Sequence, residues 1–284
     1  MNNFINTALN YTGNKFKLLP QLIPFFDYTK QNFVDLFCGS FVVGSNVLDK
    51  YNTIYANDII QDVTLISYNI INNFEPFINE VKSLCVNKDN QEGFNILRKS
   101  YNENKTPAKL YALLLCSTNN LMRFNQKFEY NQTFGKRTFN PSTEKKLNDY
   151  FNHIYQYKNK INFSSEHFLN FNIKESSMIY IDPPYGRIQD SFGNIQNKQI
   201  SEAGYNCYFK KEDDIALYNY ILNLDKQGHS FMVSGLLEHN GDKSWMMNKL
   251  LNDGFKCEYL NFNYNKVSKL KDDKKSIEVI IMNY

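Results

Sequence analysis

Four consecutive residues in the second half of the chain combine groups that could act on an amine. Asp182, Pro183, Pro184 and Tyr185 directly follow the apolar run 177–181. Two prolines fix an extended backbone and remove two N–H donors, so the carbonyls of this stretch act purely as acceptors. The Asp182 carboxylate and the Pro183 carbonyl can then accept both hydrogens of an amino group on a planar ring, on which Tyr185 can stack. A rigid loop without chemistry is the alternative interpretation.

Such an arrangement would favour group transfer to the amine nitrogen. An amine on an aromatic ring is a poor nucleophile because its lone pair is delocalised into the ring. Two acceptors that hold the hydrogens favour a tetrahedral nitrogen with a localised lone pair. Alignment and electrostatics would then supply the catalysis.

Two earlier apolar runs also end in residues that suit a ligand. Gly39 follows the run 32–37 and permits both a tight turn and the close approach of a ligand to the backbone. Asp58 follows the run 53–56, where a carboxylate can accept hydrogen bonds from a ribose. These positions predict a nucleotide-like ligand. An ordinary strand-to-helix turn and a helix-capping Asp58 are the alternatives.

Positive charge is concentrated in one part of the chain. The formal net charge is only +3, so any contact with nucleic acid must come from a local patch. Residues 96–146 contain ten lysine and arginine residues against three glutamates, a local charge of +7. This stretch predicts a surface for nucleic acid, and a solvated helix face is the alternative.

Cysteine usage and hydropathy restrict the class of protein. The five cysteines are scattered without a Cys-x-x-Cys pair, and the four histidines suggest no metal cluster, so we expect neither a disulfide framework nor a metal site. The longest apolar runs, such as 111–116, are too short to span a bilayer. We expect a soluble protein of a reducing cytoplasm.

Strands and helices are expected to alternate through most of the chain. Apolar runs rich in β-branched or aromatic residues, typical of buried parallel strands, lie at 32–37, 53–56, 178–181 and 230–233. Segments with helical spacing lie between them, at 63–74, 108–121 and 213–224. This alternation predicts an α/β fold with a parallel sheet, whose strand ends carry the residues described above.

Two segments depart from this alternation. Residues 121–141 are basic and rich in asparagine and phenylalanine, and we interpret them as an inserted module. Residues 254–284 contain two extended stretches, 256–264 and 276–283, separated by a lysine-rich connection. They predict a closing hairpin.

The motifs resemble those of the Dam family of DNA adenine methyltransferases, in particular the T-even phage form, over nearly the whole chain. The similar segments are Tyr11-Thr12-Gly13-Asn14-Lys15, residues 33–39, Asn57-Asp58, Phe134-Gly135-Lys136-Arg137-Thr138, residues 164–168, Asp182-Pro183-Pro184-Tyr185 and residues 237–241. Their order, with the cofactor motif first and Asp-Pro-Pro-Tyr after the recognition region, is that of the alpha group of amino-methyltransferases.

The resemblance implies both a fold and an activity. The fold would be a Rossmann-like class I methyltransferase sheet with helices on both faces, built from residues 1–60 and 150–284. A helical and β-hairpin target recognition domain would be inserted at residues 61–149. The activity would be methyl transfer from S-adenosyl-L-methionine to adenine N6 in double-stranded DNA, with the base flipped out, no metal, and GATC as the expected target. The enzyme would work in a bacterial or phage-infected cell, alone or in a restriction-modification system.

The resemblance also implies roles for individual residues. Catalysis would involve Asp182, Pro183, Pro184 and Tyr185. Cofactor contacts are expected for Tyr11, Lys15, Asp35, Phe37, Gly39, Asp58, His167, Phe168, Asp182, Tyr205 and Tyr208, with Lys15 near the cofactor carboxylate. DNA contacts are expected for Arg123, Asn125, Lys127, Phe134, Lys136 and Arg137. Arg137 would grip a guanine, and Lys127 and Lys136 would contact phosphates. Core packing and solvated side chains are the alternatives.

Two features depart from the family pattern. Thr133 stands where the phage relatives have a proline, which leaves the target sequence open. A polar stretch, residues 186–204, follows Tyr185. Its composition predicts little buried surface, and its position suits a lid over the target base. A tolerated surface insertion is the alternative.

Two other functions fit the same residues. Amine methylation by a Pro-Pro-Tyr motif also occurs on RNA and on protein glutamine, and a catalytically silent DNA-binding protein could retain the fold. The recognition segment favours duplex DNA over RNA or protein. The intact Asp182 and Tyr185 favour an enzyme over a silent protein.

Overall fold

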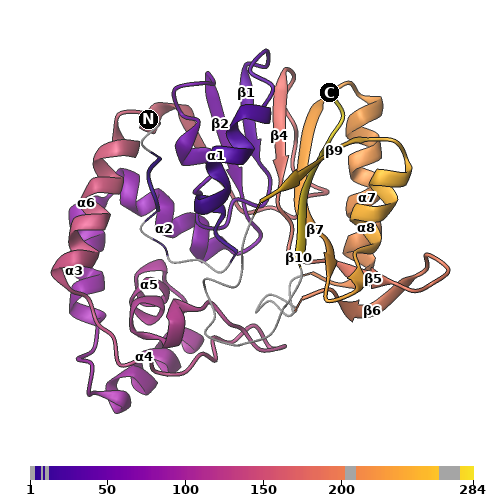
Figure 1. Ribbon diagram of the computed structural model, residues 1–284. Coiled ribbons are helices and arrows are strands. Elements are labelled where there is room, and N and C mark those ends of the chain that lie inside the picture. Colours follow the sequence, from indigo (N-terminus) through magenta and orange to yellow (C-terminus); the bar gives the residue numbers. More distant parts are fainter. Residues whose placement is uncertain (1–3, 8, 10–12, 202–208, 262–275) are drawn as a thin grey trace.

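The computed structural model describes residues 4–7, 9, 13–201, 209–261 and 276–284. Within them, the main sheet has the strand order β3-β2-β1-β4-β7-β10-β9, and a short β8 pairs with the end of β7 (Figure 1). The strands are β1 (Asn32–Asp35), β2 (Thr53–Asn57), β3 (Ile161–Ser164), β4 (Ser177–Ile181), β7 (Ser230–His239), β8 (Asp242–Lys243), β9 (Lys256–Leu260) and β10 (Ser276–Met282). The four apolar runs are confirmed as strands.

The direction of the strands determines where a ligand can bind. β3, β2, β1, β4 and β7 are parallel, whereas β10 is antiparallel to both β7 and β9. The pairing of β9 with β10 confirms the expected closing hairpin, whose connection lies outside the described residues. β2 and β3 lie on one side of β1 in the sheet, and β4 and β7, which come later in the chain, lie on its other side. The carboxyl ends of β1 and β4 therefore flank the crevice in which open α/β sheets bind ligands.

Apart from α1, which precedes β1, the α-helices lie between strands along the chain. They are α1 (Leu19–Leu22), α2 (Gln61–Asn72), α3 (Phe74–Leu84), α4 (Gln91–Glu103), α5 (Pro107–Cys116), α6 (Pro141–Tyr155), α7 (Lys211–Lys226) and α8 (Trp245–Asn252). The expected helical segment 108–121 ends early, at Cys116. Asn119 and Asn120 have φ angles of 56° and 55°, a left-handed conformation that a right-handed helix cannot contain.

Helices cover both faces of the sheet, as expected. Successive side chains of a strand point to opposite faces, so Phe33 packs with α2 to α6 whereas Val34 packs with α7 and α8. Figure 1 shows α2, α3 and α6 on one side of the sheet and α7 and α8 on the other. The α/β architecture is therefore confirmed.

The helices of residues 61–149 do not have a core of their own. Buried residues of α2, α4 and α5 belong to the same hydrophobic cluster as Phe33 and Ile54 of the sheet. This shared core holds the basic loops after α5 at a fixed place beside the sheet. The limits of a recognition domain at residues 61 and 149 stay a prediction.

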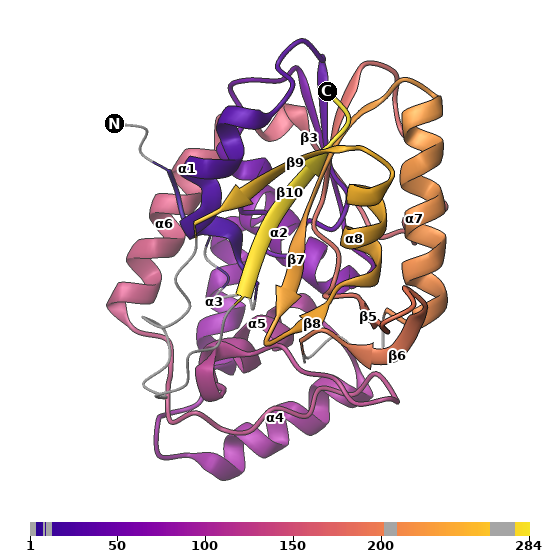
Figure 2. The ribbon, with the colours of Figure 1, turned by 45° about the vertical axis from the view of Figure 1, so that its right-hand side comes forward.

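Residues 186–201 are more ordered and more buried than their composition predicts. β5 (Arg187–Gln189) and β6 (Ile195–Gln199) form an antiparallel hairpin, which Figure 2 shows beside α8 and β8. Arg187 and Ile200 are only 8% and 3% exposed. The other residues of this part are intermediate or exposed, so the expectation of little buried surface fails only at these two positions. Residues 202–204 lie outside the described residues.

Among the helices that the structure describes, none has the length and apolar character needed to cross a membrane.

Candidate active site

Asp182, the residue after β4, accepts hydrogen bonds on both carboxylate oxygens. Lys15 Nζ donates to Oδ2 at 2.7 Å, and the Ser234 hydroxyl donates to Oδ1 at 2.8 Å. The Tyr180 and Ser234 hydroxyls are 2.8 Å apart, and because Ser234 donates to Asp182, Tyr180 donates to Ser234. These side chains come from β4, from its neighbour β7 and from the short 3-10 helix Lys15–Leu18. Together they fix the orientation of the Asp182 carboxylate.

Lys15 is a buried cation. Its side chain is 6% exposed and that of Asp182 is 19% exposed. Burial alone lowers the pKa of an ammonium group, but the charges of Asp182 and, to a smaller extent, Tyr185 and Glu278 outweigh it. The pKa of Lys15 therefore stands above its ordinary value, and the ammonium presents a permanent positive charge to Asp182. Sequence reasoning placed Lys15 near a cofactor carboxylate and did not anticipate this ion pair.

Ser234 and Tyr180 are the site residues that sequence reasoning missed. Ser234 directly follows the apolar run 230–233, as Asp182 follows residues 178–181, although β7 itself continues to His239. A polar residue directly after an apolar run was the available signal.

Two more buried carboxylates lie at the carboxyl ends of β1 and β2. Asp35 accepts the Gly44 N–H at 3.1 Å, and Asp58 accepts the N–H groups of Gly39 and Ile60 at 3.0 and 2.9 Å. Burial raises the pKa of Asp35 to about 8 and that of Asp58 to about 6, although these N–H donors act in the opposite direction. Perturbed carboxylates gathered at strand ends are typical of functional sites.

Aromatic rings lie beside these carboxylates. The ring of Phe37 is 5.7 Å from that of Phe168 and 6.3 Å from that of Phe209. Phe168 is only 3% exposed, and His167 Nε2 lies 3.5 Å from Asp213 Oδ1. The rings form an apolar wall after β1, in which Phe168 also serves as a core residue.

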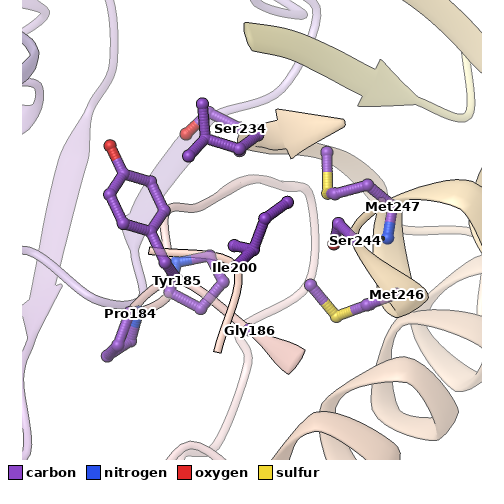
Figure 3. A pocket seen from close by; sticks show the side chains of 11 residues that line it. Pro184, Tyr185, Gly186, Ile200, Ser234, Ser244, Met246 and Met247 are labelled. Atoms are coloured by element: carbon purple, nitrogen blue, oxygen red, sulfur yellow. Dashed lines mark hydrogen bonds between the residues drawn. The ribbon is translucent and has the colours of Figure 1, made fainter. Parts of the chain in front are cut away.

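A small pocket adjoins the Asp-Pro-Pro-Tyr turn (Figure 3). Its lining includes Pro184, Tyr185, Gly186, Ser234, Ser244, Met246 and Met247. Tyr185 lies on one side, and the methionines of α8 lie on the other. Ser234 touches both this pocket and the Asp182 carboxylate. The lining combines apolar side chains with a few polar groups next to the Asp-Pro-Pro-Tyr turn.

Three expected cofactor residues, Tyr11, Tyr205 and Tyr208, lie outside the described residues. Lys15, Asp35, Gly39, Asp58 and Asp182 meet at the carboxyl edge of the sheet. In the part of the chain that the structure describes, no group of three His, Cys, Asp or Glu side chains could hold a metal ion.

Comparison with known proteins identifies the family. A family model described as D12 class N6 adenine-specific DNA methyltransferase matches residues 11–272. The chain belongs to this family. Its mostly parallel sheet with helices on both faces is accordingly a class I methyltransferase fold.

Three relatives illustrate the range of the family. Type II methyltransferase M.FokI of Planomicrobium okeanokoites is 32% identical over 100% of this chain, and modification methylase StsI of Streptococcus sanguinis is 31% identical over 99% of it. The match covers 43% of each of these two relatives, so the chain spans less than half of their length. Type II methyltransferase M.MjaIII of Methanocaldococcus jannaschii is 25% identical over 99% of both chains.

The basic loops directly after α5 form one segment, residues 117–140, which we call the recognition segment after the role expected for it. Backbone hydrogen bonds from Asn125 to Glu129 and from Asn131 to Arg123 close a small hairpin within it. Arg123, Lys127, Lys136 and Arg137 are all exposed. Arg137 Nη1 donates to Asn120 Oδ1 at 2.5 Å, and Asn120 is buried. The segment thus displays four cations, one of which is held in place.

Asn125 and Phe134 have structural contacts inside the recognition segment. The side-chain oxygen Oδ1 of Asn125 accepts the backbone N–H groups of Lys127 and Glu129 at 2.9 and 3.0 Å, so this side chain shapes the turn. The ring of Phe134 lies 5.3 Å from that of Phe94 in α4. Both side chains therefore take part in the internal structure of this segment.

Proposed function

We propose that this protein transfers a methyl group from S-adenosylmethionine to the exocyclic N6 of adenine in double-stranded DNA. The observation that carries the proposal is the Asp182 carboxylate on its Asp-Pro-Pro-Tyr turn, held by Lys15 and Ser234 beside a small pocket. A duplex buries its bases between neighbours, so the adenine must be flipped out to reach this turn.

The residues of the turn would act on the amine through position and charge. Each oxygen of Asp182 accepts one hydrogen bond from the protein, and a carboxylate oxygen can accept two. Asp182 can therefore also accept one amine hydrogen, and the Pro183 carbonyl can accept the other. Tyr185 would stack on the adenine, so that the nitrogen lone pair points toward the methyl donor.

The residues at the carboxyl edge fit S-adenosylmethionine. Buried Asp58 suits the ribose hydroxyls, and the tight loop at Gly39 lets a ligand approach the backbone after β1. The apolar wall of Phe37 and Phe168 suits an adenine ring. When bound, the cofactor supplies an electrophilic methyl group. The protein's residues hold the cofactor and orient the amine.

Cofactor affinity should rise as the pH increases from about 5 to about 7, because Asp58 ionises across this range. The pKa of Asp58 is raised by burial to about 6. Its ionised form accepts hydrogen bonds from hydroxyl groups most strongly. Titration calorimetry with S-adenosylmethionine at several pH values measures this dependence. The Asp58→Asn variant should bind S-adenosylmethionine more weakly, and its affinity should no longer change with pH across this range. If the pH profile of cofactor affinity is unchanged in the variant, Asp58 does not belong to the ribose site.

We propose GATC as the target, on the resemblance of Phe134-Gly135-Lys136-Arg137 to the T-even phage Dam type. This target is tested with a restriction enzyme whose cleavage is blocked by methylation at GATC. Plasmid DNA from cells that express the protein should resist this enzyme. If the plasmid stays sensitive while N6-methyladenine accumulates, the enzyme has another target. Some relatives are named modification methylases, which favours a role for this protein in protecting DNA from a partner restriction nuclease. We propose that it acts in the cytoplasm of the cell whose DNA it modifies.

Arg137→Ala should lose about 1 to 3 kcal/mol of discrimination at one base pair, because a bidentate arginine–guanine contact contributes about that much. The neighbouring Lys136→Ala variant is the matched control. It should weaken binding to all sequences alike and reduce the slope of log affinity against log salt concentration by about one, the value of one phosphate contact. Methylation rates on singly substituted sites at two salt concentrations separate the two effects. A uniform loss for Arg137→Ala would make it a backbone contact.

A further inference from the structure

The β5–β6 hairpin, residues 186–201, begins directly after Tyr185, and beyond Gly186 and Ile200, which line the pocket, it has no role in the chemistry proposed above. Its tip carries Phe192, whose side chain is 88% exposed, the most exposed large apolar side chain among the described residues. Single apolar side chains are common on protein surfaces. Phe192 differs from them in how firmly the tip holds it and in where the hairpin lies.

The tip is held by the side chain of Asp190. Its Oδ1 atom accepts the N–H groups of Phe192 and Asn194 at 2.9 and 2.8 Å, and its Oδ2 atom accepts the Gln196 side-chain amide at 3.0 Å. The Gly193 N–H donates to the Asp190 carbonyl at 3.1 Å. The backbone beneath Phe192 is therefore fixed, and an aromatic side chain on a fixed backbone loses little conformational freedom when it binds.

The base of the hairpin is anchored in the protein core. Arg187 Nη1 lies 3.5 Å from Asp214 Oδ2 of α7, with side-chain exposures of 10% and 0%. Arg187 Nη2 also donates to the Phe209 carbonyl at 3.1 Å. A Cβ atom at Gly186 would lie 2.2 Å from Asp214 Oδ1, so only glycine fits between the catalytic turn and this ion pair. The hairpin is thus a rigid extension of the catalytic turn.

The hairpin lies beside α8 and β8 near the carboxyl end of the sheet. Figure 1 shows β5–β6 and helix α4 on opposite sides of the carboxyl end of the sheet, and the recognition segment follows α5 on the α4 side. If the chain were fully extended, the six residues from Gly186 to Phe192 would reach at most about 20 Å. This distance corresponds to about six base pairs at 3.4 Å each.

The charges of the hairpin favour an apolar contact over a phosphate contact. Its two cationic side chains are both paired, Arg187 with Asp214 and Lys198 with Asp242 at 2.5 Å. The tip therefore offers the ring of Phe192 and little free positive charge. Apolar wedges of this kind insert between base steps in several DNA-binding proteins.

We propose that the β5–β6 hairpin is a second DNA-contacting element, and that Phe192 inserts into the duplex on the flank opposite the recognition segment. The inference rests on the proposed function, since it takes the duplex as the substrate. Phe192 contributes affinity through stacking or apolar contact. The contribution is independent of salt, unlike that of the lysines in the recognition segment.

The test measures duplex binding by fluorescence anisotropy for the wild type and for Phe192→Ala, Phe192→Trp and Tyr155→Ala. Tyr155→Ala is the matched control, because this 45% exposed aromatic residue ends α6 shortly before the amino end of β3, at the opposite edge of the sheet. Each variant is measured at two salt concentrations. Each duplex carries the sequence that the enzyme methylates. In one duplex both flanks are long, and in two others one flank is cut to about three base pairs, which is shorter than the hairpin's limit of about six base pairs.

Phe192→Ala should weaken binding to the long duplex by about tenfold to a hundredfold with an unchanged salt slope, and Phe192→Trp and Tyr155→Ala should bind like the wild type. Shortening one particular flank should weaken the wild type but not Phe192→Ala. The idea is wrong if Phe192→Ala binds the long duplex normally, if its loss is the same on every duplex, or if its only change is in oligomeric state by sedimentation. A wild type that methylates no DNA would instead refute the proposed function.

Discussion

Asp182→Asn should slow methyl transfer by about a hundredfold to a thousandfold, the usual cost of removing one well-placed electrostatic group from an active site. Asparagine has the shape of aspartate and its oxygen can still accept the hydrogen bond from Lys15. Its amide group, however, is a donor where Asp182 has an acceptor. The amine hydrogen assigned to Asp182 would lose its acceptor, and the nitrogen lone pair would stay more delocalised. Single-turnover rates on plasmid DNA measure the loss.

Two measurements make the Asp182 result specific. Calorimetry should show S-adenosylmethionine binding close to that of the wild type, because the carboxylate holds the target amine. Ser234→Ala removes one hydrogen bond to Asp182 but leaves the negative charge, so it should lower the rate much less than Asp182→Asn. Turnover of Asp182→Asn near the wild-type level would exclude the proposed role of this carboxylate.

Lys15→Met should lower the free energy of unfolding by about 3 kcal/mol, because breaking a buried ion pair leaves the partner charge uncompensated. The two side chains are 6% and 19% exposed, with a contact of 2.7 Å. Methionine fills a similar volume without charge. Urea unfolding followed by fluorescence measures the change as a shift in the midpoint.

The double variant Lys15→Met with Asp182→Asn distinguishes the ion pair from simple packing. If the unpaired carboxylate causes the loss, the double variant should be more stable than Lys15→Met alone, because no isolated charge remains. Additive losses in the double variant would show that the two side chains do not depend on each other.

The sequence was sufficient for the elements with strong local patterns. The apolar runs that became β1, β2, β4 and β7 are buried on both faces, and such strands stand out by composition alone. The end of α5 was not predictable from spacing, because apolar periodicity continues to residue 121 while Asn119 and Asn120 take a left-handed conformation. The hairpin of residues 186–201 was missed because its stability comes from Arg187 and Asp214, which are far apart in sequence.

The candidate site was predictable where function depends on a position at a strand end. Asp58 and Asp182 could be selected because each comes after an apolar run, whereas Asp35 was named through the family resemblance. The partners of Asp182 could not, since Ser234 reaches it only because β7 lies next to β4, and Lys15 is 167 residues away. Which strands are neighbours depends on the folded chain, and strand order cannot be read from the local patterns of a single sequence.

The most direct test of the central claim identifies the methylated product. The purified chain is incubated with plasmid DNA and S-adenosylmethionine carrying an isotopically labelled methyl group, and the DNA is digested to nucleosides for mass spectrometry. We predict labelled N6-methyl-2′-deoxyadenosine with the wild type and almost none with Asp182→Asn. Label in methylcytosine, in added RNA or in protein glutamine, or no label in any of them, would contradict the assignment of this chain as an adenine-specific DNA methyltransferase.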